Sequence, residues 1–261
     1  MMTHSNDWNS PAHQPKLELN NIDVWRVSLR SVSTSAKNLF GLLANDEIDR
    51  ARRFHFQRDR DRFVVVRGVL RILLSAYIPI SPEQIRFQYS ARGRPFLALD
   101  QNDVMLEFNV SHSHEMALLA FTRGPAVGID VEYVHPDIVH EQVAERFFSA
   151  QEIASLRDLP DSLQAAAFFN CWTRKEAFIK ATGEGLSRPL DQFSMSLIPD
   201  EAARLLTIQG QPEEASRWFV QDLEPGIGYA AALVAQNPVK QIHRWEYLLF
   251  DDPQPVEYQQ V

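Results

Sequence analysis

The chain has 261 residues, 45% of them hydrophobic and 23% charged, which is typical of a soluble globular protein with one large domain or two smaller ones. Its formal net charge of −8 at pH 7 argues against general nucleic-acid binding, and its single cysteine, Cys171, excludes an internal disulfide and favours a reducing compartment. The longest unbroken apolar run, Tyr229–Ala235, is far shorter than the roughly 18 residues of a membrane span. Because the N-terminal residues also lack a signal-peptide pattern, we expect a cytoplasmic protein with no membrane partner.

The first half of the chain predicts a strand, a group of helices and then short strands. Residues 1–16 are polar and contain prolines, so we expect disorder there. Ile22–Leu29 predicts a strand, and from Asn45 the pattern becomes helical, with Asn45 or Asp46 as the expected N-cap. A second helix is predicted over 61–78, ending before Pro79. The segment FQYSARGRPFLAL predicts two short strands joined by a turn.

Residues 108–121 close the first half; they begin as a strand and continue as either a strand or a short helix. The second half then repeats the order of the first. A turn at Gly124–Pro125 leads into a strand from Val127 to Tyr133. The segment EQVAERFFSAQEIASLRDL is helical, with Ser149 as a cap, and Pro160 separates it from a long helix that ends at Gly183 and Gly185. Four short strands are then predicted, in FSMSL, LLTIQG, WFVQDL and YAAALVA.

The repeated order of elements predicts an α+β protein of two similar lobes, although we detect no residue-level repeat between them. The expected boundaries are 17–126 for the first lobe and 127–250 for the second, with a tail over 251–261.

The long helix carries a carboxylate within its apolar stripe. At about 100° per residue, Glu176 falls among apolar residues, and Lys175 and Lys180 flank the stripe on opposite sides. A buried carboxylate is costly unless a cation or hydrogen bonds receive it, and two flanking ammonium groups are suited to phosphate oxygens. The simpler alternative is an exposed Glu176–Lys180 pair, worth only about 0.2–0.5 kcal/mol.

Two further carboxylates, Asp130 and Glu132, alternate along the strand in VGIDVE and therefore share one of its faces. An exposed acidic strand face is the simple alternative. If these carboxylates converge with Glu176, a hard divalent cation would relieve their repulsion. Oxygen ligands favour magnesium, and magnesium favours a phosphate-bearing substrate. No cysteine–histidine cluster indicates zinc.

Basic and polar runs add candidates for anion binding. Eight arginines lie between Arg50 and Arg71, which favours a small polyanion as ligand, with a solvated helix face as the alternative. In the run Ser111–His114, the hydroxyls and imidazoles predict phosphate contact or a structural role. A metal site on these histidines lacks a third matching ligand. The basic turn Arg92–Pro95 is either a nucleotide contact or a plain turn.

Taken together, the segments GRP, FNVSH, VGIDVE, RFFSAQE and WTRKEAFIKATGEGLSRPL occur in the order and approximate spacing found in phosphopantetheinyl transferases. The chain resembles the larger, pseudo-dimeric group of that superfamily, the type that activates surfactin synthetase. The likeness runs from about Asn45 to Phe193. The GIDVE and W-x-x-KE-x-F-x-K elements together are its most specific part.

The resemblance implies two lobes related by a pseudo-two-fold axis, with the active site in the cleft between them. It also implies a reaction in which a serine of an apo acyl carrier protein or peptidyl carrier domain attacks the β-phosphate of coenzyme A. The 4′-phosphopantetheine arm moves to the serine and adenosine 3′,5′-bisphosphate leaves. A monomer is implied because the two lobes form the interface that smaller relatives obtain by trimerising.

Residue roles also follow from the resemblance. It gives magnesium to Asp130, Glu132 and Glu176. Removal of the serine proton needs a base, and Glu176 is the best candidate, directly or through a metal-bound water, so we expect Glu176 and Lys180 to be the catalytic residues. It gives coenzyme A to a larger set: Arg50, Gly93, Arg94, Pro95, Ser111, His112, Lys175 and Lys180. The role of Glu152, the choice between magnesium and manganese, and the natural carrier are left open.

One departure and two alternatives remain. Glu47 stands where some relatives carry a second basic residue, which affects the details of 3′-phosphate recognition. A non-catalytic module that binds coenzyme A or a carrier protein is the first alternative. A nucleic-acid-binding protein that uses the arginines between 50 and 71 is the second.

Overall fold

The computed structural model describes residues 8–11, 16–135, 140–184, 188–211 and 213–249. The predicted tail over 251–261 lies outside these residues, as do Gly185 and the segments 1–7 and 12–15 of the predicted disordered N-terminus. Residues 8–11 are described, and here the prediction of disorder is wrong. Asn9 forms a β-bridge with Trp245, and the Trp8 indole donates a hydrogen bond of 2.8 Å to the Glu224 carbonyl.

The first lobe is a sheet covered by helices on one face. Its elements in chain order are β1 (Asn21–Ser28), α1 (Ser33–Leu39), α2 (Asn45–Arg52), α3 (Gln57–Tyr77), β2 (Phe87–Tyr89), β3 (Pro95–Leu97), β4 (Leu106–Ser113) and β5 (Met116–Arg123). Strands β1, β5 and β4 are antiparallel neighbours, and β2 and β3 form a separate hairpin. The second part of residues 108–121 is therefore a strand and not a helix.

The second lobe is built around a smaller sheet and one long helix. Its elements are β6 (Val127–Tyr133), α4 (His140–Phe147), α5 (Ala150–Arg157), α6 (Asp161–Thr182), β7 (Phe193–Met195), β8 (Leu205–Ile208), β9 (Trp218–Leu223) and β10 (Tyr229–Gln236). The sheet has the antiparallel order β6-β10-β9, and β7 pairs with β8. Helix α6 ends at Gly183 with φ 71°, as the glycine signal predicts.

The last strand corrects the predicted boundary of the second lobe. Strand β11 (Gln241–Tyr247) pairs in parallel with β1 and so completes the sheet of the first lobe, in the order β11-β1-β5-β4. Residues 241–247 therefore do not belong to the second lobe, whose predicted range was 127–250. From here on, the first lobe means residues up to Arg123 together with β11, and the second lobe means β6 to β10.

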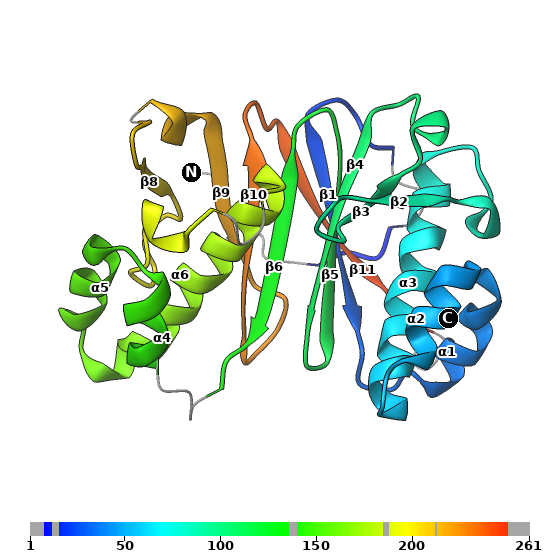
Figure 1. The fold of residues 1–261 in the computed structure, drawn as a ribbon, viewed down its shortest axis with the longest axis horizontal. Coiled ribbons are helices and arrows are strands. Elements are labelled where there is room, and N and C mark those ends of the chain that lie inside the picture. Colours follow the sequence, from blue (N-terminus) through cyan, green and yellow to red (C-terminus); the bar gives the residue numbers. More distant parts are fainter. Residues whose placement is uncertain (1–7, 12–15, 136–139, 185–187, 212, 250–261) are drawn as a thin grey trace, which may run out of the picture.

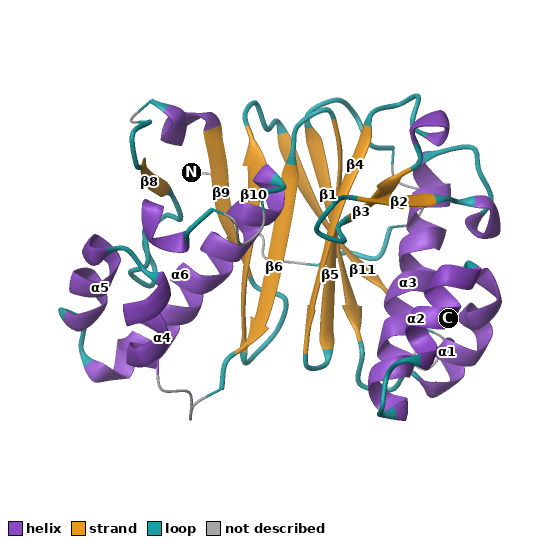
Figure 2. Ribbon diagram, viewed as in Figure 1, coloured by secondary structure: helices purple, strands orange, loops and turns teal. Residues whose placement is uncertain are grey.

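Figures 1 and 2 show these elements as layers, with the two sheets side by side in the middle and a group of helices outside each sheet. One apolar cluster fills the space between α1–α3 and the first sheet, and another surrounds α6 in the second lobe. A third cluster joins the lobes, with Ile22, Val24 and Leu118 from one sheet against Ile129 and Leu233 from the other. The mixed α+β architecture confirms the predicted class, while the pseudo-two-fold relation stays a prediction.

Helix α6 lies directly against β6, and a glycine makes this contact possible. A Cβ atom at Gly128 would overlap the Ala177 carbonyl oxygen and lie 2.5 Å from the Ala181 nitrogen. Only a residue without a side chain fits such a close approach of two backbones. The strand that carries Asp130 and the helix that carries Glu176 are thereby held in register.

Two helix starts show how side chains close the first turn. Ser149 is the N-cap of α5, as the sequence predicts, and it also forms a capping box with Glu152. Helix α2 has Ala44 as its N-cap, so the predicted cap at Asn45 or Asp46 is wrong by one or two residues. The Glu47 carboxylate closes this turn by accepting from the Ala44 amide at 3.0 Å. In the part of the chain that the structure describes, no helix has the length and apolar character needed to cross a membrane.

Candidate active site

The three predicted carboxylates come from two elements that are packed together. Asp130 and Glu132 lie on β6, and Glu176 lies on α6. Asp130 is 3% exposed, and the Lys180 ammonium is 2.6 Å from its Oδ1 atom. Because Lys180 is one helical turn after Glu176, this ion pair joins the end of α6 to the middle of β6.

The pKa values of the carboxylates are linked. Burial, followed by the negative charge of Asp130, raises the pKa of Glu176 to about 7, while Lys180 opposes this rise. Burial also raises the pKa of Asp130, against the effect of Lys180, and burial followed by the charge of Asp130 raises the pKa of Glu132. The three groups therefore repel one another in their ionised forms, and an added cation would stabilise all three.

The residues present fit a hard divalent cation in their chemistry. The buried Oδ2 atom of Asp130 lacks a hydrogen-bond partner among the described residues, and carboxylate oxygens are the ligands that magnesium prefers. Within the same described ranges, no group of three or more His, Cys, Asp or Glu side chains is gathered closely enough to form a metal site as it stands. The donor set is therefore suitable in its chemistry.

Lys180 is the basic residue at the centre of this group. Besides Asp130, its ammonium donates to the Ser111 hydroxyl at 3.0 Å and to the Ile129 carbonyl at 3.2 Å. The Ser111 hydroxyl in turn donates to Asp130 at 2.9 Å. Lys180 thus contacts β4 of the first lobe and β6 of the second, and the predicted residues Ser111, Asp130, Glu176 and Lys180 lie together.

His112 is exposed on β4, next to Ser111. The protein around its ring lowers the pKa of His112, and so do the positive charges of Lys180, Arg62 and Arg50. Cations from α2, α3 and α6 therefore surround this imidazole. An anionic ligand placed among these groups would meet positive charge from both lobes.

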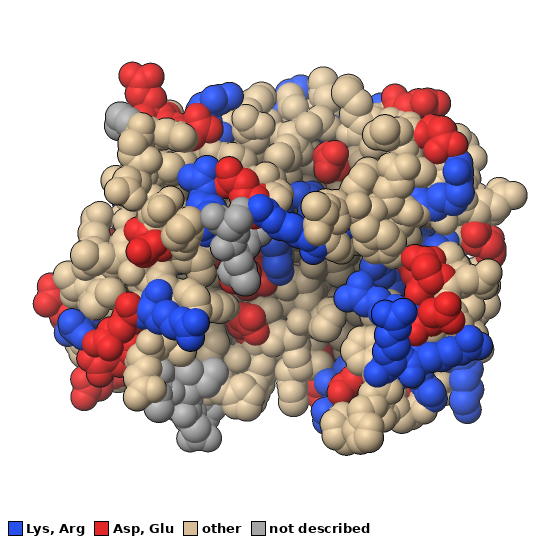
Figure 3. Space-filling view, in the orientation of Figure 1, with Lys and Arg blue, Asp and Glu red and all other residues tan. Residues whose placement is uncertain are grey.

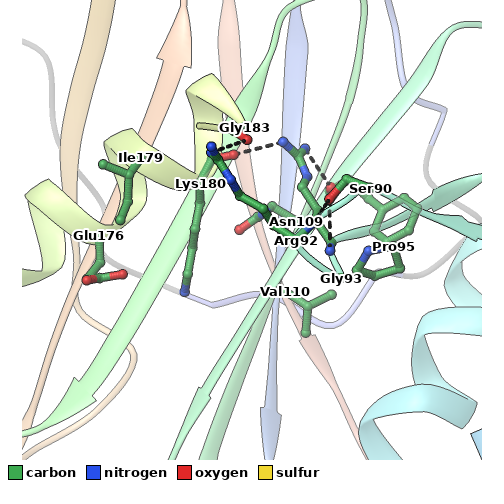
Figure 4. Close-up of a pocket in the computed structure, with 12 residues that line it drawn as sticks. Ser90, Arg92, Gly93, Pro95, Asn109, Val110, Glu176, Ile179, Lys180 and Gly183 are labelled. Atoms are coloured by element: carbon green, nitrogen blue, oxygen red, sulfur yellow. Dashed lines mark hydrogen bonds between the residues drawn. The ribbon is translucent and has the colours of Figure 1, made fainter. Parts of the chain in front are cut away.

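A pocket of about 570 Å³ lies where the lobes meet (Figure 4). The predicted turn Gly93, Arg94 and Pro95 lines it from the first lobe, and Glu176 and Lys180 line it from α6. Gly93 has φ 79°, a left-handed conformation that suits glycine. Ile179, Phe108 and Val110 also line the pocket, which therefore combines apolar side chains with charged ones.

The Arg94 side chain connects the two lobes beside this pocket. Its guanidinium donates to the Lys180 carbonyl at 2.8 Å and to the Phe108 carbonyl at 3.3 Å. The turn is therefore fastened to the end of α6. Part of the donor capacity of Arg94 is already used within the protein.

Arg50 lies in a separate cavity of about 510 Å³, lined also by Asp46, Arg53, Phe54 and Tyr89. Its guanidinium stacks over the Phe63 ring at 5.4 Å. Figure 3 shows basic side chains gathered on the lower right of this face, over α2 and α3, and others near the junction of the lobes. Arg50 is thus basic and exposed, as expected, but it does not line the pocket beside Glu176.

Lys175 does not lie where it could contact coenzyme A, as the resemblance implied. Its side chain is 0% exposed, and its ammonium contacts the Glu152 carboxylate at 2.8 Å. The same ammonium donates to the Leu190 carbonyl at 2.6 Å and to the Phe193 carbonyl at 2.7 Å. With these contacts made inside the second lobe, Lys175 cannot contact a phosphate in this structure, and the predicted coenzyme contact is corrected.

Two other predicted features also prove to be internal. Glu152, whose role was left open, caps α5, pairs with Lys175 and accepts from the Met195 amide at 2.7 Å. Glu47 is 1% exposed and pairs with Arg71 at 2.6 Å. Because Arg71 is fully buried, the run of arginines from 50 to 71 is not one continuous basic surface.

Sequence reasoning missed a seam of polar side chains between the lobes. The Asn109 side chain accepts from the Ile129 amide at 3.0 Å, and the Ser113 hydroxyl accepts from the Tyr133 amide at 3.1 Å. Ser113 also donates to Glu132 at 2.9 Å. The alternation of small polar residues in FNVSHS was the available signal, because residues two apart on a strand share one face.

Comparisons with known proteins show the family to which this chain belongs. Residues 126–234 match the family model described as the 4′-phosphopantetheinyl transferase superfamily, and residues 28–123 match the model described as 4′-phosphopantetheinyl transferase, N-terminal. These two ranges contain every residue that was assigned to the site.

Three relatives show how much of the chain is shared. The chain is 37% identical over 226 residues to the 4′-phosphopantetheinyl transferase HetI of Nostoc sp., covering 87% of this chain and 92% of the relative. It is 30% identical over 202 residues to the 4′-phosphopantetheinyl transferase Sfp of Bacillus subtilis, covering 77% and 86%. It is 26% identical over 250 residues to the human L-aminoadipate-semialdehyde dehydrogenase-phosphopantetheinyl transferase, covering 90% and 76%.

Proposed function

Because this chain belongs to the 4′-phosphopantetheinyl transferase superfamily, as an enzyme of its larger type, we propose the following reaction. The 4′-phosphopantetheine arm of coenzyme A is transferred to a serine of an apo acyl carrier protein or peptidyl carrier domain. Adenosine 3′,5′-bisphosphate is released, and the reaction depends on magnesium.

The observation that carries this proposal is the position of Glu176, which lines the same pocket as Lys180. Burial, followed by the charge of Asp130, raises the pKa of Glu176 to about 7. A carboxylate with a pKa near 7 is suited to accept a proton at neutral pH, which is what the carrier serine must lose when it attacks phosphorus. The other two carboxylates lie beside it and share its need for a cation.

The chain's own residues supply binding, orientation and proton transfer. Asp130, Glu132 and Glu176 are the groups that would hold magnesium, and the ion would neutralise charge on the pyrophosphate of coenzyme A. Lys180 contributes a further positive charge for the leaving phosphate. Glu176 accepts the serine proton, either as a direct base or through a water. Catalysis of phosphoryl transfer depends mainly on positioning the reactants and stabilising charge, and these residues provide both.

Binding of coenzyme A uses positive charge from both lobes. We assign its phosphates to Lys180, to His112 with Ser111, and to Arg50, because Lys180 and Arg50 both act on the His112 imidazole. The turn Gly93–Pro95, across from α6 in the same pocket, is assigned to the adenine end. Lys175 is left out of this assignment because its ammonium is enclosed by Glu152 and two carbonyls.

We infer a monomer in which the site is complete within one chain. The support is the third apolar cluster, in which the inner faces of the two sheets already cover each other. The proposal excludes nucleic acid as a partner, because the net charge is −8 and Arg71 and Arg67 lie inside the first lobe.

The test is transfer to a panel of apo carrier proteins from fatty-acid, polyketide and nonribosomal-peptide systems. Each carrier is incubated with the protein, coenzyme A and magnesium, and its mass is followed. At least one carrier should gain the mass of the phosphopantetheine arm. A protein that binds coenzyme A but modifies none of these carriers, with either magnesium or manganese, would contradict the proposal and favour a non-catalytic module.

The Glu176→Gln variant tests the proposed base. It keeps the volume of the side chain but removes its charge, so the transfer rate should fall by about two orders of magnitude or more. Coenzyme A affinity should fall less, because Lys180, His112 and Arg50 remain. Extra magnesium should restore little activity if Glu176 is the base, and more if it serves only as a ligand.

A matched control separates this effect from a general loss of charge. Glu201 is an exposed glutamate in the turn after β7, so Glu201→Gln should transfer at the unchanged rate. Equal rates for Glu176→Gln and Glu201→Gln would exclude Glu176 from catalysis.

A further inference from the structure

The lobes are joined at their nearest strands by side chains instead of by a backbone ladder. Strand β4 is one edge of the first sheet and β6 is one edge of the second, and within the described residues neither pairs with the other as strands do. Side-chain oxygens of β4 accept the hydrogen bonds that backbone carbonyls of a neighbouring strand would otherwise accept. Asn109, Ser111 and Ser113 accept in turn from the amides of Ile129, Val131 and Tyr133.

The two serines in this seam have the same double role. The Ser111 hydroxyl accepts from the Val131 amide at 3.4 Å and donates to the Asp130 carboxylate at 2.9 Å. Two residues further along, the Ser113 hydroxyl accepts from the Tyr133 amide at 3.1 Å and donates to the Glu132 carboxylate at 2.9 Å. Each serine therefore holds one carboxylate of β6 together with the backbone amide of the following residue.

Ser113 has one contact fewer than Ser111. The ammonium of Lys180 contacts both Ser111 and Asp130, so it also stabilises the contact between these two residues. Besides Ser113, Glu132 has the side chain of Trp172 on α6 as a hydrogen-bonding neighbour. Ser113 is thus the contact that ties the Glu132 carboxylate to the first lobe.

On the basis of the proposed function, we propose that Ser113 is a positioning residue for phosphopantetheinyl transfer. Its hydroxyl fixes the direction of the Glu132 carboxylate and so prepares Asp130 and Glu132 for a divalent cation. Ser113 itself contacts neither coenzyme A nor the carrier serine. A hydrogen bond that orients a metal ligand commonly changes metal affinity by about 10–100-fold when it is removed.

The first measurement does not need the reaction. Mn²⁺ is titrated into the metal-free protein without coenzyme A, and free Mn²⁺ is measured by electron paramagnetic resonance. Ser113→Ala should bind Mn²⁺ about tenfold or more weakly than the parent protein. Ser113→Thr keeps the hydroxyl on a strand that tolerates a β-branched residue, so it should stay within about twofold of the parent.

A control within the seam distinguishes positioning from a purely structural role. Asn109→Ala removes the same kind of contact, from a β4 side chain to a β6 amide, but Asn109 holds no carboxylate among the described residues. Asn109→Ala and Ser113→Ala should both lower the temperature of unfolding, while the Mn²⁺ affinity of Asn109→Ala should stay within about twofold of the parent. Asn109→Ala is compared only in these two measurements, because Asn109 also lines the pocket.

The second measurement uses transfer to a carrier. In Ser113→Ala, the magnesium concentration that gives half the maximal rate should rise about tenfold, and the KM for coenzyme A should change less than the magnesium requirement. Saturating magnesium should return most of the rate. Equal metal affinity in Ser113→Ala and the parent would overturn the inference. A parent protein that neither binds Mn²⁺ nor modifies a carrier would instead overturn the proposed function.

Discussion

Lys175 and Lys180 lie on the same helix, yet their ammonium groups are in very different surroundings. Lys175 is enclosed in the second lobe with Glu152, whereas Lys180 extends to Asp130 and Ser111 at the junction of the lobes. A buried ion pair contributes little net stability, but removing one partner leaves an unpaired charge in the core. The two lysines should therefore respond differently to substitution.

Lys175→Met should lower the free energy of unfolding by about 3–5 kcal/mol, because the Glu152 carboxylate would lose its buried cation. The coenzyme A affinity of the folded protein should not change. Denaturant unfolding and calorimetric titration with coenzyme A check the two parts. The double variant Lys175→Met/Glu152→Gln should recover part of the stability, since it removes the unpaired charge as well. A stable Lys175→Met protein with weakened coenzyme A binding would instead make Lys175 a phosphate contact.

The chemistry of the carboxylates could be predicted from residues alone, but the direction of Lys175 could not. Glu176 in an apolar stripe and the alternation of Asp130 with Glu132 are visible as patterns. Helix α6, however, is buried on several sides: Phe168, Arg174, Lys175 and Ala181 are all buried. From residue 167 to 182 the helix has no exposed residue. Such a segment gives no sign of which side faces the other lobe, so adjacent residues such as Lys175 and Glu176 could not be separated.

At the scale of elements, the contact between α6 and β6 decides whether the site forms. Both elements carry carboxylates of the site, and their backbones touch at Gly128. A side chain there would push the helix from the strand and separate Glu176 from Asp130.

Gly128→Ala should therefore lower the free energy of unfolding by about 3 kcal/mol or more, because its methyl group meets backbone atoms that cannot move independently. Denaturant unfolding measures this loss. Gly41→Ala is the matched control, because a Cβ at Gly41 meets nothing within 4 Å, and its effect should stay within about 0.5 kcal/mol. Equal stability of Gly128→Ala and Gly41→Ala would show that the two backbones can separate at little cost.

Most elements could be predicted where local signals were strong. The cap at Ser149, the stop at Gly183 and the turn before Pro95 are set by a few neighbouring residues, and the structure has each of them. Helix α1 was missed because its seven residues, STSAKNL, contain little apolar periodicity. Strand β11 was missed because its residues are mostly half-buried and show no alternation.

At the scale of the whole molecule, strand β11 makes the two lobes one unit. The chain returns from the second lobe to complete the first sheet, next to β1. There the His243 ring lies 2.8 Å from the buried Asp23 carboxylate, which also accepts from the Tyr77 hydroxyl at 2.7 Å. Without β11, the first lobe would lack a strand and one of the hydrogen-bond partners of the buried Asp23 carboxylate.

Unfolding should therefore occur in a single transition, although chains above about 150 residues often unfold in steps. Circular dichroism reports on both lobes, and tryptophan fluorescence reports on Trp25 in the first lobe and Trp172 and Trp218 in the second. The two denaturant curves should coincide. Two separate midpoints would show that the lobes are independent and that β11 contributes little to coupling them.

The membership of β11 could not be predicted, because it depends on pairing between residues more than 200 positions apart. Two halves with the same order of elements predict two self-contained lobes, and that is the simplest topology for such a pattern. The register between Trp25 and Trp245 is a long-range contact that leaves no local trace in the sequence.

The seam at Ser111 and Ser113 also bears on how such a protein can change during evolution. Each hydroxyl accepts from a backbone amide and donates to a carboxylate, and a hydroxyl is the smallest side-chain group that does both. Alanine would serve neither partner, and a carboxylate would repel its neighbour. The same two hydroxyl groups therefore contribute both to the contact between the lobes and to the proposed reaction. A lineage that abandoned the reaction would still lose hydrogen bonds between the lobes if it replaced these serines.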